Sequence, residues 1–98
     1  MMPDTRGLRD KVVIVTGAGH GIGRAVAERF AAEGCKVVVN DVDAGRVNEV
    51  VEAIKGGPCL AYPADVSDSS QVQAMFDATI AKFGTVDILV NNAGLINT

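Results

Sequence analysis

The sequence predicts an α/β fold in which the strands of a parallel sheet alternate with helices. Four continuous apolar runs begin about 25 residues apart, which is the length of one strand and one return helix. The segments between the runs have helical periodicity, and a glycine-rich turn follows the first run. Together these observations predict the element order β-α-β-α-β-α-β.

The four apolar runs have the character of buried strands. Each run is continuous and does not alternate with polar residues, as expected of parallel strands that are covered on both faces. Valine dominates the first two runs, and β-branched side chains favour strands. The runs are Val12–Val15, Val37–Val39, Cys59–Tyr62 and Ile88–Val90.

The three intervening segments carry apolar stripes at helical spacing. We interpret all three stripes as helix faces packed against the sheet. Ser67 is expected to cap the third helix, and Gly34 is expected to end the first. The stripes comprise Ile22, Ala25, Val26 and Phe30 in the first helix, Val47, Val50, Val51 and Ile54 in the second, and Val72, Met75, Phe76, Ile80 and Phe83 in the third.

Right-handed crossovers place the helices on both faces of such a sheet. The predicted fold class is therefore α/β, a doubly wound parallel sheet of the Rossmann type that is truncated after the fourth strand. We expect residues 1–98 to form part of one domain. The fourth strand, at residues 88–90, would then be an exposed apolar sheet edge that invites self-association.

Composition excludes several classes of protein. The formal net charge is −3 and the nine Lys and Arg residues are scattered, so nucleic acid is not an expected partner. No apolar run approaches the roughly 18 residues that span a bilayer, and residues 1–10 lack the apolar stretch of a secretory signal. Two cysteines without a Cys-x-x-Cys pattern fit a reduced chain. We therefore expect a cytoplasmic protein without a membrane segment.

The turn after the first strand has the properties of an anion site. It reads Thr-Gly-Ala-Gly-His-Gly-Ile-Gly over residues 16–23. Glycine lets the backbone turn sharply and approach a phosphate. The N–H groups at the start of the next helix favour the negative charge of that phosphate. A turn that uses glycine for steric reasons alone is the alternative. The position between a buried strand and a helix favours dinucleotide binding.

Three motifs together resemble one enzyme family. Residues 16–23 fit the spacing Thr-Gly-x-x-x-Gly-x-Gly and not the generic Gly-x-Gly-x-x-Gly. Asp-Val at 65–66 follows the third strand, and Asn-Asn-Ala-Gly at 91–94 follows the fourth. In this combination the chain resembles the N-terminal, cofactor-binding part of the short-chain dehydrogenase/reductase family. The glycine spacing resembles the branch that includes 3-oxoacyl-carrier-protein reductases and sugar or polyol dehydrogenases.

This resemblance implies an NAD-dependent oxidoreductase that transfers a hydride between nicotinamide and an alcohol or carbonyl substrate. It also implies a homo-oligomer. The family takes its proton donor from a Tyr-x-x-x-Lys motif, with a serine, downstream of Asn-Asn-Ala-Gly. Here Tyr62 is the one tyrosine, and Val66 stands where the lysine would be. We therefore predict no catalytic residue in this chain and no turnover by the 98 residues alone.

The cofactor preference is predicted from two residues. Asp41 ends the second strand, where the resemblance places an acidic side chain that accepts from the ribose hydroxyls of NAD and repels the 2′-phosphate of NADP. The alternative is a solvated aspartate at a strand end. His20 stands where NADP-preferring relatives often carry arginine, and an imidazole is not a fixed cation. Both residues predict NAD over NADP.

The resemblance also assigns the remaining cofactor contacts. Asp65 and Val66 would hold the adenine ring, residues 92–94 would pass the ribose on the nicotinamide side, and Asn91 would be more structural. A single histidine without neighbouring ligand residues predicts no metal site. The full predicted cofactor-binding set is Gly17, Gly19, His20, Gly21, Ile22, Gly23, Asp41, Asp65, Val66, Asn92, Ala93 and Gly94.

Two other functions stay open at this point. One is a free-standing module that binds NAD without turnover. The other is a degraded relative that binds no ligand, which the intact glycine motif and Asp41 disfavour. A measurement of NADH binding would distinguish the module from the degraded relative. A protein that its organism makes longer than this chain would favour the enzyme.

Overall fold

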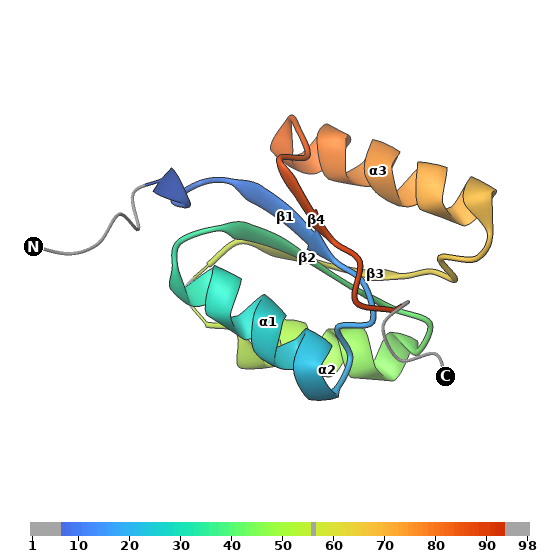
Figure 1. The fold of residues 1–98 in the computed structure, drawn as a ribbon, viewed down its shortest axis with the longest axis horizontal. Coiled ribbons are helices and arrows are strands. Elements are labelled where there is room, and N and C mark those ends of the chain that lie inside the picture. Colours follow the sequence, from blue (N-terminus) through green and yellow to red (C-terminus); the bar gives the residue numbers. More distant parts are fainter. Residues whose placement is uncertain (1–6, 56, 94–98) are drawn as a thin grey trace, which may run out of the picture.

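A computed structural model describes residues 7–55 and 57–93 of the chain (Figure 1). Strands and helices alternate through this part in the predicted order. No helix in the described ranges is both long enough and apolar enough to cross a membrane. The elements are β1 (Val12–Val15), α1 (Gly21–Ala32), β2 (Lys36–Asp41), α2 (Ala44–Ala53), β3 (Cys59–Pro63), α3 (Ser69–Phe83) and β4 (Ile88–Val90).

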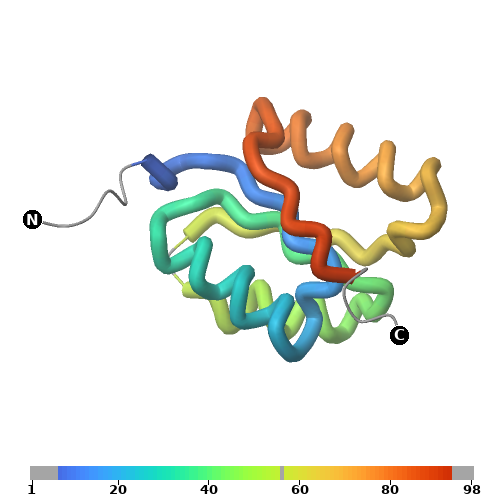
Figure 2. Tube along the Cα trace, viewed as in Figure 1, coloured from blue at the N-terminus to red at the C-terminus, as the bar shows by residue number. Residues whose placement is uncertain are grey.

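The four strands form one parallel sheet in the order β3-β2-β1-β4. In the interior strand β1, Val13 pairs with Val37 of β2 on one side and with Ile88 of β4 on the other. α1 and α2 cover one face of the sheet, and α3 covers the other (Figures 1 and 2). The predicted doubly wound sheet is confirmed. The chain order reverses at β1, between β2 and β4, and doubly wound sheets bind their ligands at such a reversal.

The interior strands β1 and β2 supply both cores of the molecule. Val13 and Val15 belong to the cluster under α1 and α2, whereas Ile14 and Val38 pack with Met75 of α3. Neighbouring side chains of a strand point to opposite faces, so an unbroken apolar run serves two layers at once. The interpretation of these two runs as doubly covered strands is therefore correct.

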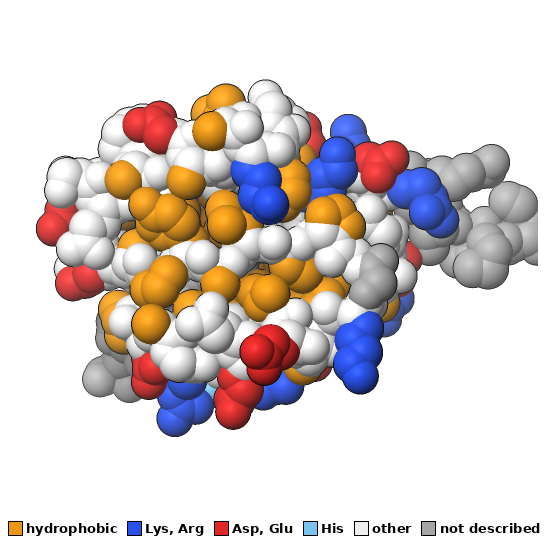
Figure 3. Space-filling model, turned by 180° about the vertical axis from the view of Figure 1, so that it is seen from behind, with side chains coloured by type: hydrophobic (Ala, Val, Ile, Leu, Met, Phe, Trp, Pro, Cys, Tyr) orange, Lys and Arg blue, Asp and Glu red, His pale blue; other side chains and the backbone are white. Residues whose placement is uncertain are grey.

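The edge strands β3 and β4 are less covered. Residues Cys59–Tyr62 of β3 are only partly buried, so the prediction of a strand covered on both faces is wrong there, because β3 lies at the edge of the described sheet. Figure 3 shows this side of the molecule, with hydrophobic side chains gathered along its middle. At the other edge Leu89 of β4 is 49% exposed, in agreement with the apolar edge expected at residues 88–90.

Two of the three helical stripes need correction. α1 buries Gly23 and Ala27, whereas Ile22 is 73% exposed and Ala25 is also exposed. The start of α1 packs so closely on the preceding turn that small residues take its inward positions. In α3, Ile80 is 49% exposed although it fits the apolar spacing. The α2 stripe is confirmed at its two central valines, which are fully buried.

The helix ends agree with the predictions at α1 but not at α3. Gly34 follows α1 with a φ of 92°, a left-handed value that suits glycine after a helix. The cap of α3 is Asp68 and not Ser67: its Oδ1 accepts the Ser70 N–H at 2.9 Å. Ser67 instead donates its N–H and hydroxyl to Asp65. Both carboxylates and the serine fit a cap pattern, so local sequence alone did not separate them.

Asp68→Ala is expected to lower the melting temperature at pH 7 by roughly 2 to 5 °C, because α3 loses the acceptor for its first N–H groups. The hydrogen bond from the Ser70 side chain holds the pKa of Asp68 below its usual value. A lowered folded-state pKa means that the carboxylate stabilises the protein above its unfolded pKa, and that this contribution disappears as the pH falls through the folded pKa. The melting temperatures of the wild type and the variant should therefore converge as the pH falls through the folded-state pKa of Asp68.

Thermal unfolding followed by circular dichroism between pH 2.5 and 7 measures this difference. Asp77→Ala, at an exposed position of the same helix, is the matched control. An equal loss in Asp77→Ala, or a gap that persists at the lowest pH, would contradict the assignment of the cap.

Candidate functional site

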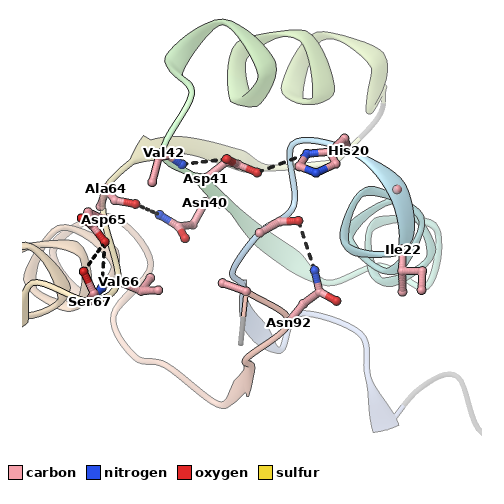
Figure 4. Close-up of a pocket in the computed structure, with 13 residues that line it drawn as sticks. His20, Ile22, Asn40, Asp41, Val42, Ala64, Asp65, Val66, Ser67 and Asn92 are labelled. Atoms are coloured by element: carbon pink, nitrogen blue, oxygen red, sulfur yellow. Dashed lines mark hydrogen bonds and ion pairs between the residues drawn. The ribbon is translucent and has the colours of Figure 1, made fainter. Parts of the chain in front are cut away.

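The carboxyl ends of the strands surround a cavity of about 440 Å³ (Figure 4). Its walls come from the turn after β1, the end of β2, and the loops after β3 and β4. This is the position at which the strand order reverses. The lining residues are Gly17, His20, Gly21, Ile22, Asn40, Asp41, Val42, Ala64, Asp65, Val66, Ser67, Asn92 and Ala93.

Most of the predicted cofactor residues lie in this lining. Gly19 and Gly23 do not line the cavity and are buried, and Gly94 lies outside the described residues. The structure adds residues on either side of Asp41 and of the Asp-Val pair at 65–66, which sequence reasoning missed. Adjacency to a predicted residue was the one signal that could have found them. These added residues are Asn40, Val42, Ala64 and Ser67.

The glycine-rich turn leaves the start of α1 open toward the cavity. Gly17 and Gly21 have φ values of 62° and 58°, in the left-handed region that side chains disfavour. His20, the cap residue of α1, makes no side-chain hydrogen bond to the helix, and the first turn holds no acidic residue. The N–H groups and the positive end of the helix dipole thus favour an anionic ligand at this end of the cavity.

Gly23 allows α1 to pack directly on that turn. A Cβ at this position would overlap the Gly17 carbonyl oxygen and would lie 2.6 Å from Nδ2 of Asn92. Asn92 is buried, and its Nδ2 donates a hydrogen bond to the same Gly17 oxygen at 3.2 Å. The turn after β1 and the loop after β4 are joined at this point. The missing side chains create the close backbone cradle that a pyrophosphate needs.

Thr16 holds the loop after β4 by a second set of bonds. Its hydroxyl lies 3.2 Å from the Asn91 Oδ1 acceptor and itself accepts the Ala93 N–H at 3.0 Å. Asn91 therefore has the structural contact that the sequence analysis expected. Asn92 combines a structural hydrogen bond with a place in the cavity wall.

Asp41 is mostly buried, with 8% of the residue exposed. Its Oδ2 accepts the Gly19 N–H at 3.0 Å, and its Oδ1 accepts the Val42 N–H at 2.7 Å. Nδ1 of His20 lies 3.7 Å from Oδ2. The alternative of a solvated aspartate at the strand end is therefore wrong. The carboxylate joins β2 to the glycine turn and still forms part of the cavity wall.

Asn40 connects three walls of the site. The residue is 1% exposed, and its Nδ2 donates to the carbonyl oxygens of Tyr62 at 2.9 Å and Ala64 at 3.3 Å. The main-chain carbonyl oxygen of Asn40 accepts the Ala18 N–H at 2.7 Å. The main-chain carbonyl of Asn40 therefore holds the turn after β1, and its side-chain amide holds the loop after β3.

Asp65 presents a second carboxylate from the loop after β3. The hydroxyl of Ser67 donates to its Oδ1 at 2.7 Å, and the Ser67 N–H donates at 2.9 Å. These bonds hold the pKa of Asp65 below its usual value, so the side chain is charged at neutral pH. The Asp65 N–H donates to Oε1 of Gln71 at 2.8 Å, which ties the loop to α3.

The cavity combines three kinds of surface. Backbone N–H groups form one end, Asp41 and Asp65 offer hydrogen-bond acceptors, and apolar side chains stand between them. Among these apolar side chains, Ile22 and Val42 are 73% and 70% exposed. An anion site, acceptors for hydroxyl or amino groups, and apolar walls for flat rings meet the needs of a dinucleotide. The fold is that of a Rossmann-type α/β protein, and the cavity has the kinds of surface that a dinucleotide needs.

Metal binding and chemistry at a tyrosine or a thiol have little support among the described residues. They contain no group of three or more His, Cys, Asp or Glu that could hold a metal ion. Tyr62 packs against the core cluster that contains Ile14 and Met75. Cys35 and Cys59 are free thiols, and burial raises the pKa of both, so they are protonated at neutral pH.

Comparison with known proteins agrees with this class. The family model described as short chain dehydrogenase matches residues 11–98. The chain is 45% identical over 93 residues to 7alpha-hydroxysteroid dehydrogenase of Escherichia coli (strain K12), covering 93% of this chain and 36% of that protein. The crystal structure of a hydroxysteroid dehydrogenase from Escherichia coli superposes with a TM-score of 0.86 at 45% identity, covering 93% of this chain and 39% of that one.

A third match includes a bound cofactor. A short chain dehydrogenase/reductase from Burkholderia phymatum in complex with NAD has a TM-score of 0.81 at 42% identity, covering 84% of this chain and 30% of that one. The chain belongs to the short-chain dehydrogenase/reductase family. It spans about a third of the length of the relatives that it matches.

Asn40→Ala is expected to lower the free energy of unfolding by about 1 to 3 kcal/mol, because the carbonyl oxygens of Tyr62 and Ala64 lose a buried donor. Asn48→Ala removes the same side chain from an exposed position of α2 and should change it by less than about 0.5 kcal/mol. Urea unfolding of the two variants beside the wild type measures both values. Equal effects of the two substitutions would show that the Asn40 amide does not hold the site together.

Proposed function

We propose that this chain is the NAD-binding part of an oxidoreductase that transfers a hydride between nicotinamide and an alcohol or carbonyl carbon. The observation that carries the proposal is the buried Asp41 carboxylate beside the glycine cradle. Membership of the family supports the oxidoreductase class, and NAD in a similar solved structure supports a nicotinamide cofactor.

The cavity walls suggest how NAD lies in the site. We assign the adenine ring to the apolar surfaces of Val42 and Val66, with Asp65 as the acceptor for its amino group. The hydroxyls of the adjoining ribose would donate to Asp41. Both assignments use side chains that the structure leaves facing one cavity (Figure 4).

The other half of NAD would follow the glycine turn. We assign the pyrophosphate to Gly17, His20, Gly21 and the open N-terminus of α1. The nicotinamide end would then pass Ile22, Asn92 and Ala93, with Gly94 beyond the described residues. Buried Gly19 and Gly23 would act indirectly, by letting the backbone approach the phosphates.

Electrostatics favours NAD over NADP at this site. A phosphate charge about 4 Å from Asp41 would cost about 1 kcal/mol in a water-like dielectric and about 4 kcal/mol near a protein surface. That range corresponds to roughly 5-fold to 1,000-fold in affinity. His20 supplies no fixed positive charge to offset this repulsion.

The residues of this chain would bind and orient the cofactor. When bound, NAD accepts or supplies the hydride. Proton transfer needs further groups, and the 98 residues contain no Tyr-x-x-x-Lys motif, so we expect this sequence by itself to bind NAD without turnover. We further propose that residues 1–98 belong to a single domain, that the protein is cytoplasmic, and that it forms a homo-oligomer.

An NAD-binding module without redox chemistry is the second candidate, because the surfaces of the cavity fit cofactor binding alone as well. An absorbance assay at 340 nm separates the two candidates. It uses the protein as its cell makes it, NAD and a panel of secondary alcohols. NADH formation supports the oxidoreductase, whereas saturable NAD binding without NADH formation supports the module.

Asp41→Asn is expected to lower the ratio of the NADPH and NADH dissociation constants by at least about 5-fold. Asparagine keeps an oxygen for the Gly19 N–H and removes the charge that repels the 2′-phosphate. Fluorescence titration with each reduced cofactor measures the ratio. Asp77→Asn makes the same chemical change on the exposed side of α3 and should leave the ratio as it is. An unchanged ratio in Asp41→Asn, with NADH still bound, would contradict the assignment of Asp41 to the ribose next to adenine.

A further inference from the structure

Asn40 has a side-chain oxygen that takes no part in the hydrogen bonds described above. Its Nδ2 donates to the carbonyl oxygens of Tyr62 and Ala64, at 2.9 and 3.3 Å. A carbonyl oxygen can only accept, so the amide nitrogen has to face these two atoms and Oδ1 has to point elsewhere. None of the residues that the structure describes donates a hydrogen bond to Oδ1.

This oxygen opens into the cavity. Within the described part of the chain, every fully enclosed side-chain nitrogen or oxygen has a hydrogen-bond partner. Oδ1 has no such partner, so it is not fully enclosed, although only 1% of the Asn40 residue is exposed. Asn40 lines the cavity, and Figure 4 shows its nitrogen turned toward Ala64 and its oxygen turned away from it. A buried acceptor therefore lies in the cavity wall, where a donor from a ligand would satisfy it.

The position of Asn40 in β2 places this acceptor on the same side of the sheet as α3. Val38, two residues earlier, packs with Met75 of α3, and alternate residues of a strand point to the same face. Asp41 points to the other face, where it accepts the Gly19 N–H. Oδ1 of Asn40 therefore belongs to the wall formed by the loop that leads from β3 into α3, whereas Asp41 belongs to the wall formed by the glycine turn.

The loop after β3 offers a second acceptor in different surroundings. Asp65 is exposed, so water competes with a ligand for its carboxylate. The Asn40 oxygen is buried, and a ligand that covers it without supplying a hydrogen leaves it without any hydrogen bond. Sites with a buried acceptor of this kind strongly reject an analogue that lacks the donor.

We propose that Oδ1 of Asn40 accepts a hydrogen bond from the adenine amino group and thereby selects adenine over bases that lack this group. This inference rests on the proposed function, in which the adenine ring lies between Val42 and Val66. The amino group has two hydrogens, of which Asp65 receives one and Asn40 receives the other. A carbonyl group at the same place on the ring would bring its oxygen against two acceptors. The amide nitrogen of Asn40 thus holds the loop, and its oxygen contacts the base.

The experiment is calorimetric titration of the protein, as its cell makes it, with NAD⁺ and with nicotinamide hypoxanthine dinucleotide. The second ligand carries a carbonyl oxygen where adenine carries its amino group. The quantity compared is the dissociation constant of the hypoxanthine dinucleotide divided by that of NAD⁺. In the wild type this ratio should exceed about 10, and Asn40→Ala should lower it by about tenfold, because the variant lacks the buried acceptor.

Two controls separate the acceptor from the structural role of the amide. Asn40→Asp loses the donor to Tyr62 and Ala64 but keeps an oxygen at the Oδ1 position, so its ratio should not fall. In an Asp65→Ala background, Asn40→Ala should lower the ratio again, because the two acceptors act separately. Circular dichroism at the assay temperature shows that each variant is folded. Asn40→Ser, whose hydroxyl keeps one donor for the carbonyls, replaces Asn40→Ala if that variant does not fold.

A wild-type ratio near 1, or equal ratios in the wild type and Asn40→Ala, would overturn the role of Oδ1 and leave NAD⁺ binding intact. An equal fall in Asn40→Ala and Asn40→Asp would overturn it as well, because the residue would then act only by holding the loop. The same holds if Asn40→Ala has no further effect in the Asp65→Ala background. Absence of saturable NAD⁺ binding by the wild type would overturn the proposed function itself, and the inference with it.

Discussion

The close packing of α1 on the turn after β1 is the constraint from which the rest of the site follows. Gly23 has no Cβ, so the helix meets the Gly17 carbonyl oxygen directly, and Asn92 donates to that oxygen from the loop after β4. Any side chain at position 23 would push these three segments apart. The same contact aims the first N–H groups of α1 at the cavity, so the geometry that makes the fold compact also makes an anion site.

The buried polar residues at the end of β2 extend this arrangement across the sheet. Asp41 accepts the Gly19 N–H, and Asn40 bonds to Ala18, Tyr62 and Ala64. Burying such groups is costly unless they are hydrogen-bonded, and here the bonds run to the neighbouring walls of the cavity. The acidic group of the cavity wall and the amide that holds the loop after β3 are thus adjacent residues of one strand.

Much of the fold followed from local patterns. The bounds of β1 and β4 and the central valines of α2 agree with the sequence prediction, since buried strands and amphipathic helices carry strong periodic signals. The errors at Ile22, Ile80 and Ser67 share one cause. Apolar spacing and capping chemistry tell which residues are able to pack or cap, whereas the neighbouring elements decide which of them do so.

The sequence by itself determined the order of the elements, the glycine turn and the acidic end of β2, because each depends on short-range chemistry that residue types reveal. Only the tertiary structure decided that Asp41 is buried, that Asn40 and Val42 share its cavity, and that His20 lies beside its carboxylate. These facts depend on contacts between residues far apart in the chain, such as Gly19 and Asp41, or on opposite sides of a strand. The parallel pairing of β1, β2 and β3 brings these segments together.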